Sequence, residues 1–223
     1  MQLKAVNVGP AKKVAWRDGV SSAIHKGHVH GLVQVGFLGL EGDEQADLIN
    51  HGGADKAVFV MPEENYARFR IQAPYGYLGE NLTISGLDEK QVCLGERLLV
   101  GSVVLEVTQP RSPCWKLAEQ VLETSDWSSA AEFLDAYSQS GHVGFYCRVL
   151  QEGLLKKGDE VKKKPFEPED GITRPKLTIH DLFLAKHYHR SEADWALLKQ
   201  AAAHPALSEA WRKAIAKLIQ QAS

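Results

Sequence analysis

The chain has 223 residues, of which 44% are hydrophobic and 24% are charged, and its net charge is −2 at pH 7. This composition is typical of a globular protein with a real core, either one large domain or one domain with a small appendage. The balanced charge argues against nucleic-acid binding, because most nonspecific affinity for nucleic acid comes from neutralised phosphates. No apolar stretch approaches the roughly 20 residues that span a bilayer, so we expect no membrane segment.

The three cysteines, Cys93, Cys114 and Cys147, are an odd number without close spacing. Such usage suits a reducing compartment better than a disulfide scaffold. The first ten residues lack a basic start followed by an apolar run, so we expect no signal peptide. The sequence therefore predicts a cytoplasmic protein.

Short strands separated by glycines dominate the first part of the chain. Residues 3–8 alternate between apolar and polar side chains, and residues 144–150 (GFYCRVL) are rich in aromatic and β-branched types. Residues 97–100 and 103–108 flank Gly101-Ser102, which is typical of a tight hairpin. Short helices are predicted only at about 62–70, 116–123 and 128–137. Many strands with few helices favour a closed or nearly closed β-barrel.

The residue pattern changes after residues 165–175, a linker that is rich in proline and acidic residues. Residues 178–187, 191–202 and 206–221 have helical periodicity, with no strand between them. Ser191 is a plausible N-cap with Asp194 three residues later. We therefore expect two domains, a β-barrel over residues 1–165 and a small three-helix domain over residues 175–223.

The first candidate site segment is the glycine-dense run GLEGDEQAD, residues 39–47, followed by His51-Gly52-Gly53. Close-set glycines let the backbone turn sharply and approach a ligand. Asp43 is equally consistent with capping the loop amides and with touching a ligand. His51 favours a functional role, because a titratable group beside flexible backbone is poor core material. Lys56, at the entrance of the next strand, is either solvated or acts with His51 to hold an anion such as a phosphate.

Two further segments contain polar side chains that core packing does not explain. In GENLT, residues 79–83, Asn81 is expected mainly to bond a loop, and Glu80 to orient a cation or a histidine. In QPRSPCWKL, residues 109–117, two prolines stiffen the loop before a helix begins at Cys114. A cysteine at a helix N-terminus near Arg111 favours the thiolate, which serves as a nucleophile or a metal ligand.

The sequence gives less support to other kinds of functional site. Cys93 and Cys147 lie in apolar strand patterns, where a cysteine acts as a small hydrophobic residue. His25, His28 and His30 form a loose cluster without a cysteine partner, so zinc spacing is absent. The glycine loops that bind nucleotide phosphates and the serine-hydrolase motifs are also absent.

Four segments of this chain, in this order, resemble the MOSC domain family, and specifically its YiiM-type members. The matching text is GLEGDEQADLINHGGADKAV, GENLTISGL, VTQPRSPCWKL and GHVGFYCRVLQEGLLKKGDEV. The tail that contains HPALSEAWRKAIAKL resembles the three-helix domain that follows the barrel in that subgroup. The resemblance implies a fold that is mainly β with α, a MOSC-type β-barrel with a small C-terminal three-helix domain.

The resemblance also implies a function. Proteins of this type are associated with the reduction of N-hydroxylated compounds, including N-hydroxylated purine bases, by means of the molybdenum cofactor. By motif position Cys114 is the metal or sulfur ligand, and the expected catalytic residues are Cys114, His51 and Arg111. The expected cofactor-binding residues are Lys56, Arg111, Asn81 and Asp43. Because the sequence has no flavin or nicotinamide motif, a separate flavoprotein reductase is the expected electron donor.

Two other functional hypotheses remain open. In the first, the chain is a sulfur carrier without metal, and Cys114 carries a persulfide. Alternatively, the chain would be a binding module that senses or delivers the cofactor without catalysis. Metal analysis separates the enzyme from both, and the mass of the Cys114 side chain separates the carrier from the module.

Overall fold

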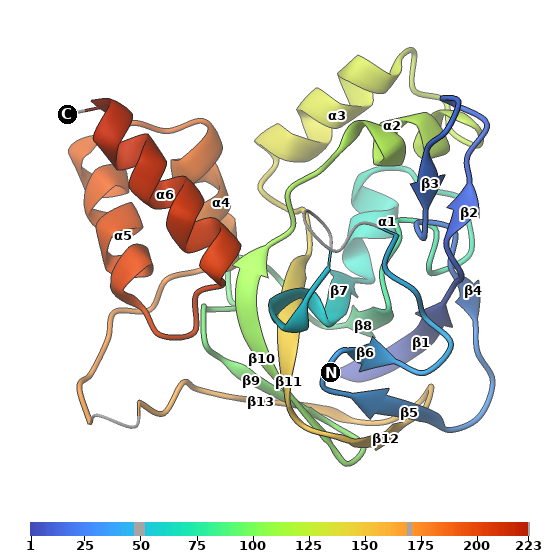
Figure 1. The fold of residues 1–223 in the computed structure, drawn as a ribbon, viewed down its shortest axis with the longest axis horizontal. Helices are drawn as coiled ribbons and strands as arrows, with labels where there is room; N and C mark the ends of the chain where they lie inside the picture. Colours follow the sequence, from blue (N-terminus) through green and yellow to red (C-terminus); the bar gives the residue numbers. More distant parts are fainter. Residues whose placement is uncertain (47–51, 169–170, 223) are drawn as a thin grey trace.

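The structure is a computed structural model that describes residues 1–46, 52–168 and 171–222. A large curved sheet fills the centre of the molecule, and helices cover it on two sides (Figure 1). Its strands, in order across the sheet, are β13 (Val161–Lys164), β9 (Arg97–Val100), β10 (Val103–Pro110), β11 (Phe145–Gln151), β7 (Val58–Pro62), β8 (Leu82–Ser85), β1 (Gln2–Val8) and β4 (Gly27–His28). Neighbouring strands are antiparallel except β7 and β8, which are parallel.

Backbone hydrogen bonds close this sheet into a barrel. The segment that leads into β13 pairs with β1: the Leu3 amide donates to the Asp159 carbonyl at 3.0 Å, and the Val161 amide donates to the Met1 carbonyl at 3.0 Å. An isolated bridge between Gln2 and Glu160 lies between them. The first and last strands of the barrel therefore meet, in agreement with the predicted closed or nearly closed barrel, and their facing edges are paired with each other.

Smaller strands extend the barrel at its rim. A three-stranded sheet joins β12 (Gly153–Leu155), β5 (Val33–Gly36) and β6 (Gly39–Leu40), and a hairpin pairs β2 (Lys12–Lys13) with β3 (Ser21–Ser22). A 3-10 turn, η1 (Ala54–Lys56), precedes β7. Lys56, expected at a strand entrance, therefore lies within this turn.

Strand β7 shows how alternation divides the interior. Val58 and Val60 belong to the cluster inside the barrel, whereas Phe59 and Met61 belong to a second cluster under the helices. Successive side chains of a strand point to opposite faces, so a strand covered on both faces is apolar throughout. The covering helices are α1 (Glu64–Arg68), α2 (Trp115–Leu122) and α3 (Ala130–Gln139). The helix predicted at about 62–70 is thus shorter than expected.

The last three helices stand beside the barrel, next to β10 (Figure 1). They are α4 (Ile179–His187), α5 (Glu192–Ala203) and α6 (Glu209–Ala222). Leu207, Trp211 and Ile215 are buried, as their helical spacing predicts. Within the described residues, no helix has the length and the apolar character that crossing a membrane requires.

Candidate functional site

A pocket that is partly open to solvent lies where β10 ends and α2 begins. Segments far apart in the sequence contribute to it: the loop after β3, the glycine-dense run, η1, β7, the turn before β8, and the QPRSPCWKL segment. Its described lining residues are Ser22, Ala23, Ile24, Lys26, Asp43, Glu44, Gln45, Ala46, Lys56, Phe59, Leu78, Gly79, Asn81, Arg111, Cys114, Lys116 and Tyr146. Four basic side chains thus face two carboxylates, so the described wall has an excess of positive charge, which favours an anionic ligand.

Cys114 reaches this pocket because β10 ends abruptly. The last residue of the strand, Pro110, pairs with Phe145, and the Arg111 amide then donates to the Gly144 carbonyl at 3.0 Å. Pro113 follows two residues later, and Cys114 takes an extended conformation, with φ −130° and ψ 164°, as the N-cap of α2. Its thiol makes no capping hydrogen bond and is partly exposed, so the sulfur is available to a ligand.

Arg111 is buried at 5% exposure beside Cys114 and Tyr146. Its guanidinium carbon lies 5.5 Å from the centre of the Phe59 ring. Burial alone opposes the charge of the guanidinium, but interactions with the Cys114 sulfur and with tyrosines raise its pKa above the ordinary value. Nη1 is buried without a hydrogen-bond partner among the described residues. Burying a donor without a partner costs free energy. This indicates that a ligand in the pocket supplies an acceptor for Nη1.

Tyr146 lies against Arg111 on the neighbouring strand β11. Cys147 points into the barrel, so the alternation of β11 turns the Tyr146 ring outward to the pocket, 5.1 Å from the Phe59 ring. Burial raises the pKa of the Tyr146 phenol, although Arg111 opposes this shift. The phenol therefore remains a proton donor at neutral pH.

Lys56 enters the pocket from η1. Its side chain belongs to a residue that is only 8% exposed, and its amide donates to the Gly53 carbonyl at 2.9 Å. Gly53 has φ +93°, a conformation that glycine adopts without strain, and its amide donates to the Gln45 side chain at 3.0 Å. The HGG segment and the glycine-dense run are thereby joined.

Asp43 and Asn81 build one wall of the pocket by bonding each other. Asn81 Nδ2 donates to Asp43 Oδ2 at 2.8 Å, and its Oδ1 accepts from the Phe59 amide at 2.9 Å. Asp43 Oδ1 accepts from the Gly9 amide at 2.9 Å and forms an ion pair with Lys26. Burial lowers the pKa of Lys26, and Asp43 opposes this effect. Asp43 and Asn81 therefore hold the loop. This is one of the two roles expected for Asp43 and the main role expected for Asn81. Both residues also line the pocket.

Glu80 lies behind this wall and is fully buried. One of its oxygens accepts from the Tyr66 hydroxyl at 2.8 Å, the Gly76 amide at 2.7 Å and the Thr83 hydroxyl at 2.7 Å. Burial raises the pKa of this carboxyl, and the three hydrogen bonds oppose the shift. Glu80 thus organises the turn that presents Asn81. Lys26 is the nearby cation with which it interacts electrostatically.

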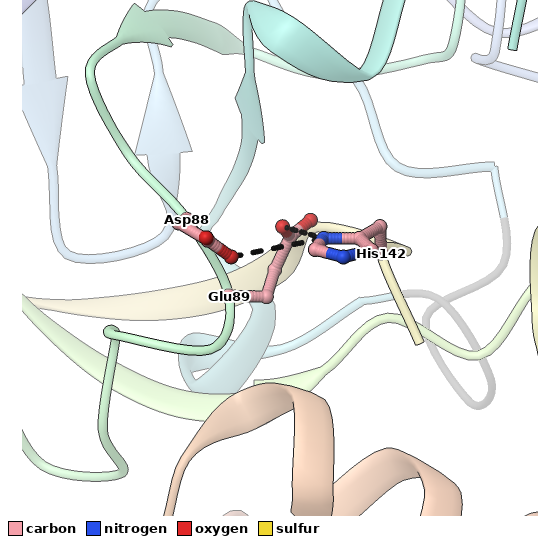
Figure 2. Close-up of side chains that lie close together, drawn as sticks. All are labelled: Asp88, Glu89 and His142. Atoms are coloured by element: carbon pink, nitrogen blue, oxygen red, sulfur yellow. Dashed lines mark hydrogen bonds and ion pairs between the residues drawn. The ribbon is translucent and has the colours of Figure 1, made fainter. Parts of the chain in front are cut away.

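A second polar cluster, formed by Asp88, Glu89 and His142, lies outside the residues that line the pocket (Figure 2). His142 Nδ1 lies 2.8 Å from Glu89 and 3.8 Å from Asp88. The other Glu89 oxygen accepts from the Asn65 amide group at 2.7 Å and from the Gly144 amide at 3.0 Å. Although three such groups could ligate a metal, each Glu89 oxygen already has a protein partner, so we assign the cluster a structural role. It fixes Gly144, to which the Arg111 amide is bonded.

The structure brings five of the predicted site residues to one pocket: Asp43, Lys56, Asn81, Arg111 and Cys114. His51 lies outside the described residues. Lys26 and Tyr146 also line the pocket, although neither is among the predicted site residues, and only the strand period of GFYCRVL indicates where the Tyr146 side chain points. Cys93 and Cys147 are buried as expected, and burial raises the pKa of both thiols.

Comparison with known proteins finds matches over most of the chain. Residues 47–162 match the MOSC domain, and residues 182–222 match the YiiM-like 3-alpha helix domain. The chain is 32% identical over 96% of its length to an uncharacterized protein, YflK, of Bacillus subtilis, and covers 92% of it. It is similar to the crystal structure of YiiM from Geobacillus stearothermophilus, with 33% identity, a TM-score of 0.73 and 97% of each chain covered. It is also 34% identical over 71% of its length to a protein named reductase from Gibberella moniliformis, of which it spans only 28%.

Proposed function

We propose, on the premise that this chain belongs to the MOSC domain family, that it is a molybdenum-cofactor-dependent reductase of N-hydroxylated compounds. N-hydroxylated purine bases are one such class of substrate. In the overall reaction the N–O bond breaks, two electrons and two protons are taken up, and an N–H group and water are released. The observation that carries the proposal is the pocket that joins Cys114 to the buried cations Arg111 and Lys56.

The residues present fit the molybdenum cofactor, a pterin with a phosphate and a pair of sulfur atoms that hold the metal. The unpartnered Nη1 of Arg111 is a donor for an anionic oxygen, and Lys56 lines the same pocket. When bound, the cofactor supplies the two-electron redox centre.

The protein side chains perform the remaining tasks. A cysteine sulfur is a soft ligand and suits a site of this kind, so we assign metal ligation to Cys114. Lys56 and Arg111 hold the phosphate or an anionic part of the substrate, and Asn81 and Asp43 shape the wall that faces it. The Tyr146 phenol, kept protonated by burial, offers a proton at its Oη to the leaving oxygen. We also assign His51 to the catalytic group, on its motif position alone.

The electrons come from outside this chain in our proposal, through a separate flavoprotein reductase. The described part of the chain offers no glycine loop for a flavin or nicotinamide at the start of a helix, and the relative named reductase is several times longer than the matched region. Three free cysteines suit a cytoplasmic location.

The test is metal and pterin analysis of protein made in a host that synthesises the cofactor, together with reduction of an N-hydroxylated base in the presence of a flavoprotein reductase. We expect about one molybdenum per chain in the wild type. Cys114→Ser should abolish the activity and leave the melting temperature nearly unchanged, because the partly exposed thiol makes no capping hydrogen bond to α2 that the substitution would remove. Cys93→Ala is the matched control, and it should keep both molybdenum and activity. Wild-type activity in the serine variant would remove Cys114 from the mechanism.

The alternative functions predict different outcomes of the same preparation. A sulfur carrier would lack molybdenum and would show one additional sulfur atom on Cys114 by mass spectrometry. A cofactor-binding module would contain molybdenum but would not reduce the substrate under any tested donor.

A further inference from the structure

The turn η1 lies between the pocket and the three-helix domain. Lys56, its last residue, lines the pocket, whereas the preceding residue, Asp55, faces the other way and contacts α6. Strand β10 comes close to the start of α6, because the Ser208 amide donates to the Thr108 carbonyl at 3.1 Å, and Arg111 directly follows the end of β10. Two adjacent residues of one turn thus join two parts of the molecule.

The Asp55 carboxylate caps α6 across the domain boundary. Asp55 Oδ2 accepts from the Glu209 amide, the first residue of α6, at 3.0 Å. The first amides of a helix have no partner within the helix, and a negative charge there is favoured by the helix dipole. Ser208 completes this end from within the domain, because its Oγ accepts from the Trp211 amide at 3.2 Å.

The other carboxylate oxygen of Asp55, Oδ1, and the backbone carbonyl of Asp55 anchor the turn to the barrel. Asp55 Oδ1 lies 2.8 Å from Arg148 Nη2, and this nitrogen also donates to the Ala206 carbonyl at 3.0 Å. The Asp55 carbonyl accepts from the Thr108 hydroxyl at 2.6 Å. Thr108 is itself bonded to the three-helix domain, through its carbonyl and the Ser208 amide at 3.1 Å. The position of η1 is therefore determined jointly by β10, β11 and α6.

We propose that Asp55 is a positioning residue that holds Lys56 in the pocket, and that the three-helix domain sets the anion affinity of the pocket through it. This inference rests on the proposed function in one respect, that the pocket receives a phosphate-like anion. A η1 turn released from α6 loses the contacts that direct its last residue inward, and Lys56 then spends less time at the anion.

The test uses the metal-free full chain and a cofactor-independent probe. Pyrophosphate is titrated against the rate at which iodoacetamide alkylates Cys114, which lies in the same pocket, and protection gives a dissociation constant. We expect Lys56→Met to raise this constant at least tenfold, and Asp55→Ala to raise it about as much. Removal of a negative charge would by itself strengthen anion binding, so a loss of affinity in Asp55→Ala has no simple electrostatic explanation.

Two controls separate positioning from general damage. Glu106→Gln changes the charge by the same amount and alters another partner of Arg148, at 3.3 Å, while the Glu209 amide keeps Asp55 as its acceptor. Asp194→Asn alters a cap at the start of α5, at the other end of the domain. Both should bind pyrophosphate within twofold of the wild type. If Asp55→Ala folds poorly, Asp55→Asn serves in its place: it loses the ion pair with Arg148 that anchors η1 and keeps an acceptor for the Glu209 amide, so the dissociation constant should rise in the same direction but less than in Asp55→Ala.

A double-mutant cycle decides whether Asp55 acts through Lys56. The variant that combines Asp55→Ala with Lys56→Met should bind no more weakly than Lys56→Met alone. Full additivity, or wild-type affinity in Asp55→Ala while Lys56→Met is impaired, would overturn the positioning role and leave the proposed function intact. Absence of any protection in the wild type would overturn the anion site itself, and the positioning role with it.

Discussion

The thiols of Cys114 and Cys147 lie on opposite sides of the β10–β11 ladder in opposite environments. Cys147 is fully buried inside the barrel, and its pKa is raised by burial, so it remains a neutral apolar group. Cys114 is partly exposed beside the buried guanidinium of Arg111. At the scale of single residues, the surroundings of each cysteine, and not the residue type, therefore decide its chemistry.

Cys147→Ala should reduce the free energy of unfolding by about 1–2 kcal/mol, because it leaves a small cavity in a fully packed core. Chemical denaturation monitored by tryptophan fluorescence measures this change. Pyrophosphate protection of Cys114 should be unaltered, since Cys147 faces away from the pocket. A variant as stable as the wild type would show that neighbouring core side chains fill the space left by the sulfur, and it would contradict this prediction.

Helix α5 illustrates the element scale, because its start is determined by its own sequence. Ser191 Oγ accepts from the Asp194 amide, and the Asp194 side chain accepts in return from the Ser191 amide at 2.9 Å. This reciprocal arrangement satisfies two amides that have no partner within the helix. The N-cap and the residue three positions later predict this start before any tertiary contact is known.

Ser191→Ala should reduce the free energy of unfolding by about 1 kcal/mol, because the Asp194 amide loses its partner. Thermal or urea unfolding measures the effect. Gln200→Ala, at an exposed position of the same helix, is the matched control and should change stability by less than about 0.5 kcal/mol. Equal effects of the two substitutions would contradict a specific contribution from the cap.

At the scale of the whole molecule, His204 lies where the linker, the barrel and the helices meet. Its ring centre is 4.6 Å from that of Phe166 in the linker, and a side chain on Gly95 of the barrel would collide with both rings. His204 Nδ1 accepts from the Ala206 amide at 3.2 Å, which requires the neutral ring. Burial, and then the nearby Arg174 and Arg212, lower the pKa of His204 to about 4.

This junction should make the protein sensitive to acid. The pKa of His204 is about 4 in the folded state against an ordinary 6.5, so the unfolded chain takes up the proton first. The contribution of His204 to the free energy of unfolding is therefore fully present above pH 6.5 and is lost as the pH is lowered from 6.5 to 4, about 3 kcal/mol in all. Urea unfolding across this range should show a flatter pH dependence in His204→Gln than in the wild type. Parallel curves would show that His204 makes no such contribution.

Local features were predictable wherever neighbouring residues determine the structure. The β9–β10 hairpin, the start of α2 at Cys114 and the helix periodicity around Trp211 all agree with the sequence. Four motif segments also identified most of the pocket, because glycine, proline and polar residues mark where backbone turns and polar groups gather. The exact length of α1 was less predictable, since packing rather than propensity ends so short a helix.

The sequence by itself determined the strand-rich barrel, the three helices and the place of Cys114 at the start of a helix, since periodicity, caps and proline act over a few residues. Only the tertiary structure decided which residues share the pocket with it. Lys26 and Tyr146 come from β-strand neighbours and loops that no local pattern links to Cys114. Asp55 likewise became significant only when α6 was found against η1, 154 positions from Asp55 to Glu209 along the chain. Such contacts depend on how the barrel closes and on where the helices pack, and these are properties of the whole chain.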